Sequence, residues 1–118
     1  MSVDVYQYPA CGTCKKALKW LRDHGVPFTS HHIVESPPSR AELASLVERS
    51  GTPIRKWLNT SGQSYRQGGF KERLATMSDA QILDALAADG KLIKRPIVVA
   101  KDAVLVGFSE AEYAEHFG

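Results

Sequence analysis

Residues 8–21 read YPACGTCKKALKWL; they join the end of a β-prone run to the start of an amphipathic helix and hold both cysteines of the chain. The run from Val3 to Tyr8 is rich in residues that favour strands, and Pro9 ends it because proline cannot donate to a sheet ladder. From Thr13 to His24 the apolar residues follow helical spacing, and Gly25 then stops the helix. The stretch therefore predicts a strand, a cysteine turn and a helix.

The segment after this helix completes a βαβ unit. Residues 28–34, FTSHHIV, have the β-branched and aromatic residues of a second strand. Two strands joined by a short helical crossover run parallel, with a right-handed connection. The first third of the chain is thus expected to build the parallel part of a sheet.

The cysteine turn has the composition of a redox site. Cys11 stands where the strand passes into the helix, so the free N–H groups and the dipole of that helix favour a thiolate there. Cys14 follows about one helical turn later, close enough for a disulfide, and Lys15 and Lys16 add positive charge. We expect Cys11 to attack as the nucleophile and Cys14 to resolve. A Cys-x-x-Cys pair in a βαβ unit is typical of thioredoxin-like redox sites.

Two other interpretations of the cysteines compete with redox chemistry. The pair could be half of a zinc site completed by His31 and His32, but adjacent strand residues point to opposite faces and cannot easily reach one ion. The thiols could instead be buried and inert. The polar pair Gly12-Thr13 argues for exposure, so redox chemistry is favoured over both.

The middle of the chain, about 39–90, is expected to be a mostly helical insertion. Ser39 and the glutamate three residues after it have the pattern of a capping box, and Gly51 is a suitable terminator for that helix. Ser78 caps a further helix, which Gly90 is expected to stop.

The chain ends in a hairpin and a helix. PIVVA at 96–100 and AVLVG at 103–107 predict antiparallel strands joined by a tight two-residue turn, and Ser109 is expected to cap a last helix. The summed order is βαβ, the insertion, then ββα. We expect a single α/β domain spanning 1–118, thioredoxin-like, with a mixed four-stranded sheet.

Composition limits what the chain can bind and where it acts. It has 118 residues, 43% hydrophobic and 24% charged, with a formal net charge of +2, which is ordinary for a globular domain. This mild charge argues against nucleic acid or a membrane as a direct partner. The sequence shows no targeting segment and no apolar run long enough to span a bilayer, and its paired thiols suit a reducing compartment. We expect a cytoplasmic monomer.

A second informative stretch is KRPIVV at 94–99, where Arg95 precedes Pro96 at the head of a strand. An X-Pro bond can be cis at modest cost, and a cis bond here would lay Arg95 beside the cysteine turn. Its guanidinium could then stabilise the Cys11 thiolate or bind an oxyanion such as a glutathione carboxylate. The alternative is a solvated arginine before a trans proline, which the cysteine context makes the weaker interpretation.

The cysteine stretch, KRPIVV, the ending GFSEAEY at 107–113 and the overall length together resemble the ArsC/Spx family. The similarity covers essentially the whole chain. The family includes glutaredoxin-linked arsenate reductases and Spx/MgsR-type regulators of thioredoxin-like fold. The resemblance implies no resident cofactor, glutathione as a co-substrate, and glutathione/glutaredoxin or thioredoxin as the reductant.

The arsenate reductases of this family use the first cysteine of the turn as nucleophile and hold arsenate with three arginines. Cys11 matches that nucleophile, and Arg95 matches one of the arginines. Asn59 and Gly107 stand where the other two are expected. Because one arginine of three neutralises an oxyanion weakly, we do not expect an efficient arsenate reductase.

Spx-like members often keep the cysteine pair as an intramolecular redox switch. They bind the C-terminal domain of the RNA polymerase α subunit through a glycine of the helical middle, which Gly51 matches, although Gly51 equally suits an ordinary helix end. The leading hypothesis is a thiol-disulfide redox protein, closer to an oxidoreductase, that uses Cys11, Cys14 and Arg95. The alternative is a redox-sensing transcriptional regulator that binds the polymerase.

Overall fold

A mixed sheet lies at the centre of the computed structural model, which describes residues 3–9, 11–60 and 62–117. The sheet has four strands in the order β2-β1-β3-β4. β1 pairs in parallel with β2 and antiparallel with β3, and β3 pairs antiparallel with β4. The strands are β1 (Val3–Gln7), β2 (Phe28–His32), β3 (Ile97–Val99) and β4 (Val104–Val106). The predicted α/β fold with a mixed four-stranded sheet is confirmed.

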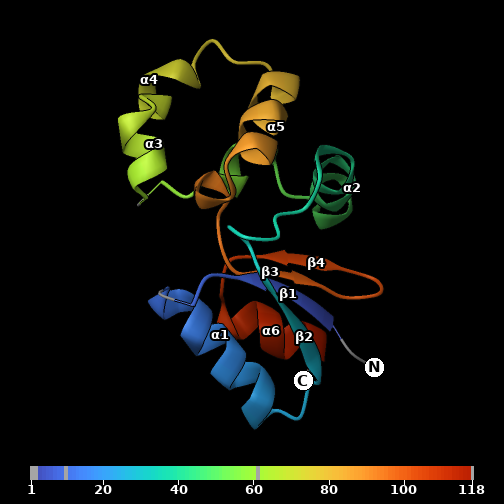
Figure 1. Ribbon diagram of the computed structural model, residues 1–118. Helices are drawn as coiled ribbons and strands as arrows, with labels where there is room; N and C mark the ends of the chain where they lie inside the picture. Colours follow the sequence, from blue (N-terminus) through green and yellow to red (C-terminus); the bar gives the residue numbers. More distant parts are fainter. Residues whose placement is uncertain (1–2, 10, 61, 118) are drawn as a thin grey trace.

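Helices cover both faces of the sheet (Figure 1). Helix α1 and the last helix, α6, lie on one face, and the helices of the insertion lie on the other. The helices are α1 (Gly12–Asp23), α2 (Arg40–Ser50), α3 (Gln63–Gln67), α4 (Phe70–Arg73), α5 (Asp79–Ala88) and α6 (Glu110–Phe117), with short 3-10 turns η1 (Ile54–Trp57) and η2 (Gly90–Leu92). Across the described residues, no helix is both long and apolar enough to cross a membrane.

Successive side chains of a strand point to opposite faces of the sheet, and on each face they pack into an apolar cluster. Val5 and Val98 are fully buried with Leu21 of α1 and Tyr113 of α6. Ile97, the neighbour of Val98, belongs to the cluster on the insertion side. Burying an aliphatic side chain of this size stabilises a fold by about 1.5–3 kcal/mol. The sheet is therefore fixed from both faces, which gives the cysteine turn a rigid base.

The helix ends of the insertion follow the capping signals of the sequence. Ser39 and Glu42 form a reciprocal capping box at the start of α2, and Ser78 forms another with Gln81 at the start of α5. Gly51 ends α2 in the left-handed conformation, with φ of 67°, as a helix C-cap commonly does. These predictions are confirmed.

Two predictions about local structure are corrected. The second strand ends at His32 rather than continuing through Val34, because the His32 ring accepts the backbone N–H groups of Val34 and Glu35 and turns the chain. Gly90 opens η2 instead of stopping α5. A Cβ on Gly90 would lie 2.2 Å from the carbonyl oxygen of Ile33, so this glycine allows two backbone segments to approach closely.

Candidate active site

Cys11 is the N-cap residue of α1, directly after the turn that leaves β1. Its sulfur accepts a hydrogen bond from the Cys14 backbone N–H at 3.4 Å, and its own N–H donates to the Tyr8 carbonyl at 2.9 Å. The open N–H groups of a first helical turn are available to an N-cap side chain. The sulfur is thus held at the positive end of the helix while the residue stays partly exposed.

Cys14 lies on the inward face of α1. It is fully buried, as is Ala17 one turn further on, and its sulfur accepts the backbone N–H of Tyr8 at 3.5 Å. The exposure expected for the cysteine pair holds only for Cys11, because the spacing of three residues turns Cys14 toward the apolar side of the helix. Both cysteines are free thiols in this structure.

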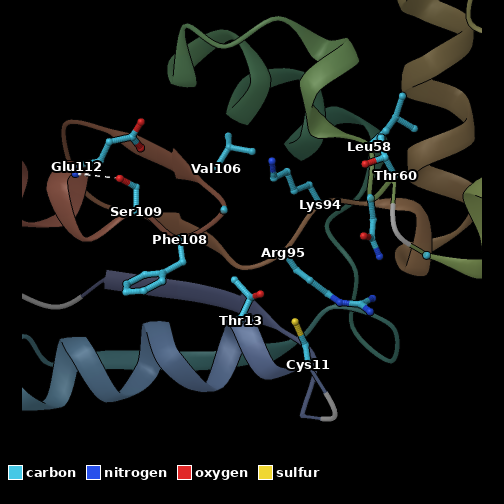
Figure 2. A pocket seen from close by; sticks show the side chains of 13 residues that line it. Cys11, Thr13, Leu58, Thr60, Lys94, Arg95, Val106, Phe108, Ser109 and Glu112 are labelled. Atoms are coloured by element: carbon cyan, nitrogen blue, oxygen red, sulfur yellow. Dashed lines mark hydrogen bonds between the residues drawn. The ribbon is translucent and has the colours of Figure 1, made fainter.

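Arg95 reaches the cysteine turn from the head of β3. The Arg95-Pro96 peptide bond is cis, and Figure 2 shows the side chain extending toward Cys11. The Cζ of Arg95 lies 4.6 Å from the centroid of the Tyr8 ring, a cation–π distance. Within the part of the chain that the structure describes, the buried Nε and Nη1 of Arg95 have no hydrogen-bond partner.

The two thiols have opposite pKa shifts. Burial opposes ionisation of Cys11, but the hydrogen bonds from Cys14 and the Arg95 guanidinium outweigh it and lower the Cys11 pKa. Burial raises the pKa of Cys14 to about 12, and the adjacent Cys11 adds to the rise despite the Tyr8 N–H. Lys15 and Lys16 are exposed and are not among the groups that lower the Cys11 pKa. The thiol that ionises first is therefore the accessible one.

The Cys11 sulfur opens into a cavity of about 560 Å³ between the sheet edge, the insertion and α6 (Figure 2). Arg95 lines this cavity together with Asn59 and Gly107, the two positions at which the resemblance expects arginine. The structure thus brings the nucleophile position and all three positions expected to carry arginine to one cavity. Of the three, only Arg95 carries a positive charge.

The backbone at Gly107 is fixed from two sides. Its N–H donates to the Pro96 carbonyl at 2.8 Å, and its carbonyl accepts the buried Tyr113 hydroxyl of α6 at 3.1 Å. With φ of 79°, the residue has a conformation that favours glycine. Helix α6 is in this way tied to the loop that carries Arg95.

Two residues at the site were not singled out from the sequence. The sequence pattern indicates only a strand end at Tyr8, yet the Tyr8 ring lies against Arg95. Lys94 also lines the cavity and belongs to KRPIVV, where its position beside Arg95 was the available signal.

The described hydrogen bonds of the His31 and His32 rings go to partners other than the cysteines. The Nε2 of His31 lies 2.9 Å from an Asp4 carboxylate oxygen, and the Nδ1 of His32 accepts the turn N–H groups. Over residues 3–9, 11–60 and 62–117, no three His, Cys, Asp or Glu side chains are grouped to hold a metal ion. The described residues therefore contain no set of ligands that would support a zinc site at the cysteines.

The ArsC family model matches residues 6–116, nearly all of the chain. The chain belongs to the ArsC family. Among curated relatives, it is 48% identical to protein YusI of Bacillus subtilis (strain 168) over 117 residues, covering 99% of each chain. Relatives in this family thus match over the cysteine turn, the insertion and the closing hairpin together.

Other members of the ArsC family have different stated roles. An arsenate reductase of Rhizobium meliloti (strain 1021) is 35% identical, over 85% of this chain and 70% of that one. The global transcriptional regulator Spx of Streptococcus pyogenes serotype M1 is 30% identical, over 93% of this chain and 81% of that one. A crystal structure of an ArsC family related protein from Bacteroides fragilis superposes with a TM-score of 0.94 at 41% identity, covering 98% and 97%. The chain is therefore related to both arsenate reductases and transcriptional regulators, on a shared thioredoxin-like fold.

Proposed function

We propose that this ArsC family protein is a thiol-disulfide oxidoreductase in which Cys11 is the nucleophile and Cys14 the resolving thiol. The observation that carries the proposal is the contrast between the two sulfurs. Cys11 has a lowered pKa and opens into a cavity, whereas Cys14 is buried behind it with a raised pKa. A thiolate that forms readily and is accessible is what thiol-disulfide exchange requires.

The reaction proceeds in two exchanges. The Cys11 thiolate attacks one sulfur of a substrate disulfide, the sulfur–sulfur bond breaks, and one half leaves as a thiolate. Cys14 then gives up its proton to the leaving thiolate or to solvent, attacks the Cys11 sulfur and releases the other half. The product is a Cys11–Cys14 disulfide, which thioredoxin or glutathione/glutaredoxin reduces with two electrons.

The structure also favours the order of these exchanges. The neighbouring Cys11 is one of the groups that raise the pKa of Cys14. Once Cys11 is part of a mixed disulfide it carries no negative charge, so its opposition to ionisation of Cys14 disappears. Formation of the mixed disulfide at Cys11 therefore makes the Cys14 thiol easier to ionise.

Arg95 supports the thiolate in this proposal. Its guanidinium lies beside Cys11 and contributes to the lowered pKa, and its buried Nε and Nη1 are left without a described partner. Asn59 and Gly107 add no positive charge to the cavity that they line. Reduction of arsenate is for this reason expected to be weak.

Turnover tests the proposal. Purified protein is supplied with bis(hydroxyethyl) disulfide, NADPH and either thioredoxin with thioredoxin reductase or glutathione/glutaredoxin with glutathione reductase. The turnover is the NADPH consumption above that of the same reductant system without the protein. We expect turnover in the wild type, loss in Cys11→Ser, and a trapped mixed disulfide, visible by mass spectrometry, in Cys14→Ser. Absence of turnover together with absence of a Cys11–Cys14 disulfide at any redox potential would overturn the proposal.

Redox-sensing transcriptional regulation is the second candidate, and the kinship to Spx favours it. Gly51, the residue matched to the polymerase contact, is exposed at the end of α2, although its φ of 67° already explains a glycine there. The test is capture of the C-terminal domain of the RNA polymerase α subunit by oxidised and by reduced protein. Capture in one redox state without disulfide turnover would replace the enzyme function by this one.

A further inference from the structure

A second cation, Lys94, lines the cavity that holds Cys11 and Arg95. Consecutive residues of an extended chain project to opposite sides. Figure 2 shows this divergence: Arg95 extends toward Cys11, and Lys94 extends toward Val106 of β4. The two cations thus lie at different places along one cavity instead of converging on a single point.

Gly107 provides the space that Lys94 occupies. A Cβ on Gly107 would lie 3.1 Å from the Cε of Lys94, tighter than an ordinary van der Waals contact. The hydrogen bonds of Gly107 to Pro96 and Tyr113 hold this backbone in place. The position at which arsenate reductases of the family are expected to carry an arginine is therefore the one that admits Lys94 here.

The charge of Lys94 has no ion-pair partner within 4.0 Å among the described residues. The described lining of the cavity contains one carboxylate, Glu112, whose backbone N–H donates to Ser109. Two cations face one carboxylate, so the cavity favours an anionic ligand.

We propose that Lys94 is a specificity-determining residue that selects disulfides carrying a negatively charged group several bonds away from the sulfur. This inference rests on the proposed function, since the sulfur of the ligand must lie at Cys11. An extended molecule can place its sulfur beside Cys11 and Arg95 and its charged end at Lys94, whereas a small tetrahedral oxyanion has no separate charged end for Lys94 to hold. The apolar side chains of Val106 and Phe108 line the same cavity and suit the intervening carbon chain.

Lys94 takes no part in bond making. The Cys11 thiolate attacks the disulfide, the sulfur–sulfur bond breaks and one half leaves as a thiolate, while Lys94 only holds the charged end. A partly exposed ion pair of this kind contributes modestly, and salt screens it. The effect is therefore on selection among disulfides and not on the chemistry of the sulfur.

A matched series of disulfides tests the inference. Dithiodipropionate is anionic, bis(hydroxyethyl) disulfide is neutral and cystamine is cationic, with the same two-carbon spacing between sulfur and end group. The rate of Cys11 mixed-disulfide formation is measured by stopped flow in Cys14→Ser and in the same background with Lys94→Met. Lys101→Met removes an equal charge at the exposed β3–β4 turn and is the control.

We expect the preference for the anionic over the neutral disulfide to fall roughly three- to fivefold in Lys94→Met. In Lys101→Met the ratio of the anionic to the neutral rate is expected to stay at its wild-type value, and high salt is expected to reduce the wild-type preference. An equal preference with and without Lys94, or none in the wild type, overturns the inference while leaving the proposed function intact. Failure of Cys11 to react with any of the three disulfides overturns both.

Discussion

At the scale of single residues, Tyr8 contacts all three residues to which we give a redox role, Cys11, Cys14 and Arg95. Its N–H donates to the Cys14 sulfur, its carbonyl accepts the Cys11 N–H, and its ring lies against the guanidinium of Arg95. The rings of His32 and Tyr8 pack nearly perpendicular to one another, with centroids 5.4 Å apart. The buried Nε and Nη1 of Arg95 have no described hydrogen-bond partner, so the Tyr8 ring is one of the contacts available to hold this side chain, together with the Cys11 sulfur.

Tyr8 is therefore expected to act as a positioning residue for Arg95. In Tyr8→Leu the Cys11 pKa should rise, because the guanidinium loses a cation–π contact of about 0.5–2 kcal/mol and moves more freely. Tyr8→Phe keeps the ring and should leave the pKa at its wild-type value. The measurement is the pH dependence of Cys11 alkylation.

The Arg95→Met background distinguishes positioning from a general structural effect. Without the guanidinium, Tyr8→Leu should no longer shift the Cys11 pKa, whereas Arg95→Met alone should raise it and slow alkylation at neutral pH severalfold. Equal shifts in Tyr8→Phe and Tyr8→Leu, or a full Tyr8→Leu effect in Arg95→Met, would contradict the role given to the ring.

At the scale of helices and strands, the close backbone approach at Gly90 controls how the insertion meets the sheet. Gly90→Ala would place a Cβ 2.2 Å from the Ile33 carbonyl oxygen, and we expect a loss of about 1–3 kcal/mol in the free energy of unfolding. Gly12→Ala is the control, since no described atom outside its own helix and chain neighbours lies within 4 Å of the added Cβ. Urea unfolding compares the two, and similar stability of both variants would show that the segments can separate without cost.

The elements could be predicted where the signal is local. The capping boxes at Ser39 and Ser78 and the strand before the cysteine turn follow from residues within four positions of one another. The ring of Tyr8 against Arg95 could not be predicted, because it joins the end of β1 to the approach to β3, far apart in sequence. The burial of Cys14 was missed because the polar pair Gly12-Thr13 indicates exposure, whereas the helical face decides it.

At the scale of the whole molecule, the site is assembled from every region of the chain. Cys11 comes from the βαβ unit, Asn59 from the insertion, Arg95 from the approach to β3 and Gly107 from the loop before α6. The two apolar clusters hold these parts together from both faces of the sheet. Ionisation at the site is consequently coupled to the stability of the fold.

The stability of the reduced protein should fall at alkaline pH through Cys14. Its pKa is raised from 9.0 to about 12 on folding, so the stabilisation is full below about pH 9 and is lost as the pH rises toward 12. Cys14→Ser should flatten this part of the pH profile in urea unfolding. Tyr113, whose pKa burial also raises, contributes in the same direction, so Tyr113→Phe is measured alongside.

An unchanged alkaline slope in Cys14→Ser would contradict the raised pKa. Cys11 provides the opposite sign: its pKa is lowered on folding, so its contribution is present above the unfolded value and is lost as the pH falls through the folded one. Cys11→Ser should therefore reduce stability at a pH above the pKa of the unfolded thiol but not in acid.

The tie between Tyr113 and Gly107 also has a consequence for the order of synthesis. A ribosome makes the cysteine turn early, and it makes Arg95, Gly107 and Tyr113 only near the end of this chain. Until these residues are made, the two thiols have neither their guanidinium neighbour nor the closing loop. The contribution of Arg95 to the lowered pKa of Cys11 is therefore added only late in translation, after the hydrogen bonds from Cys14 can already form.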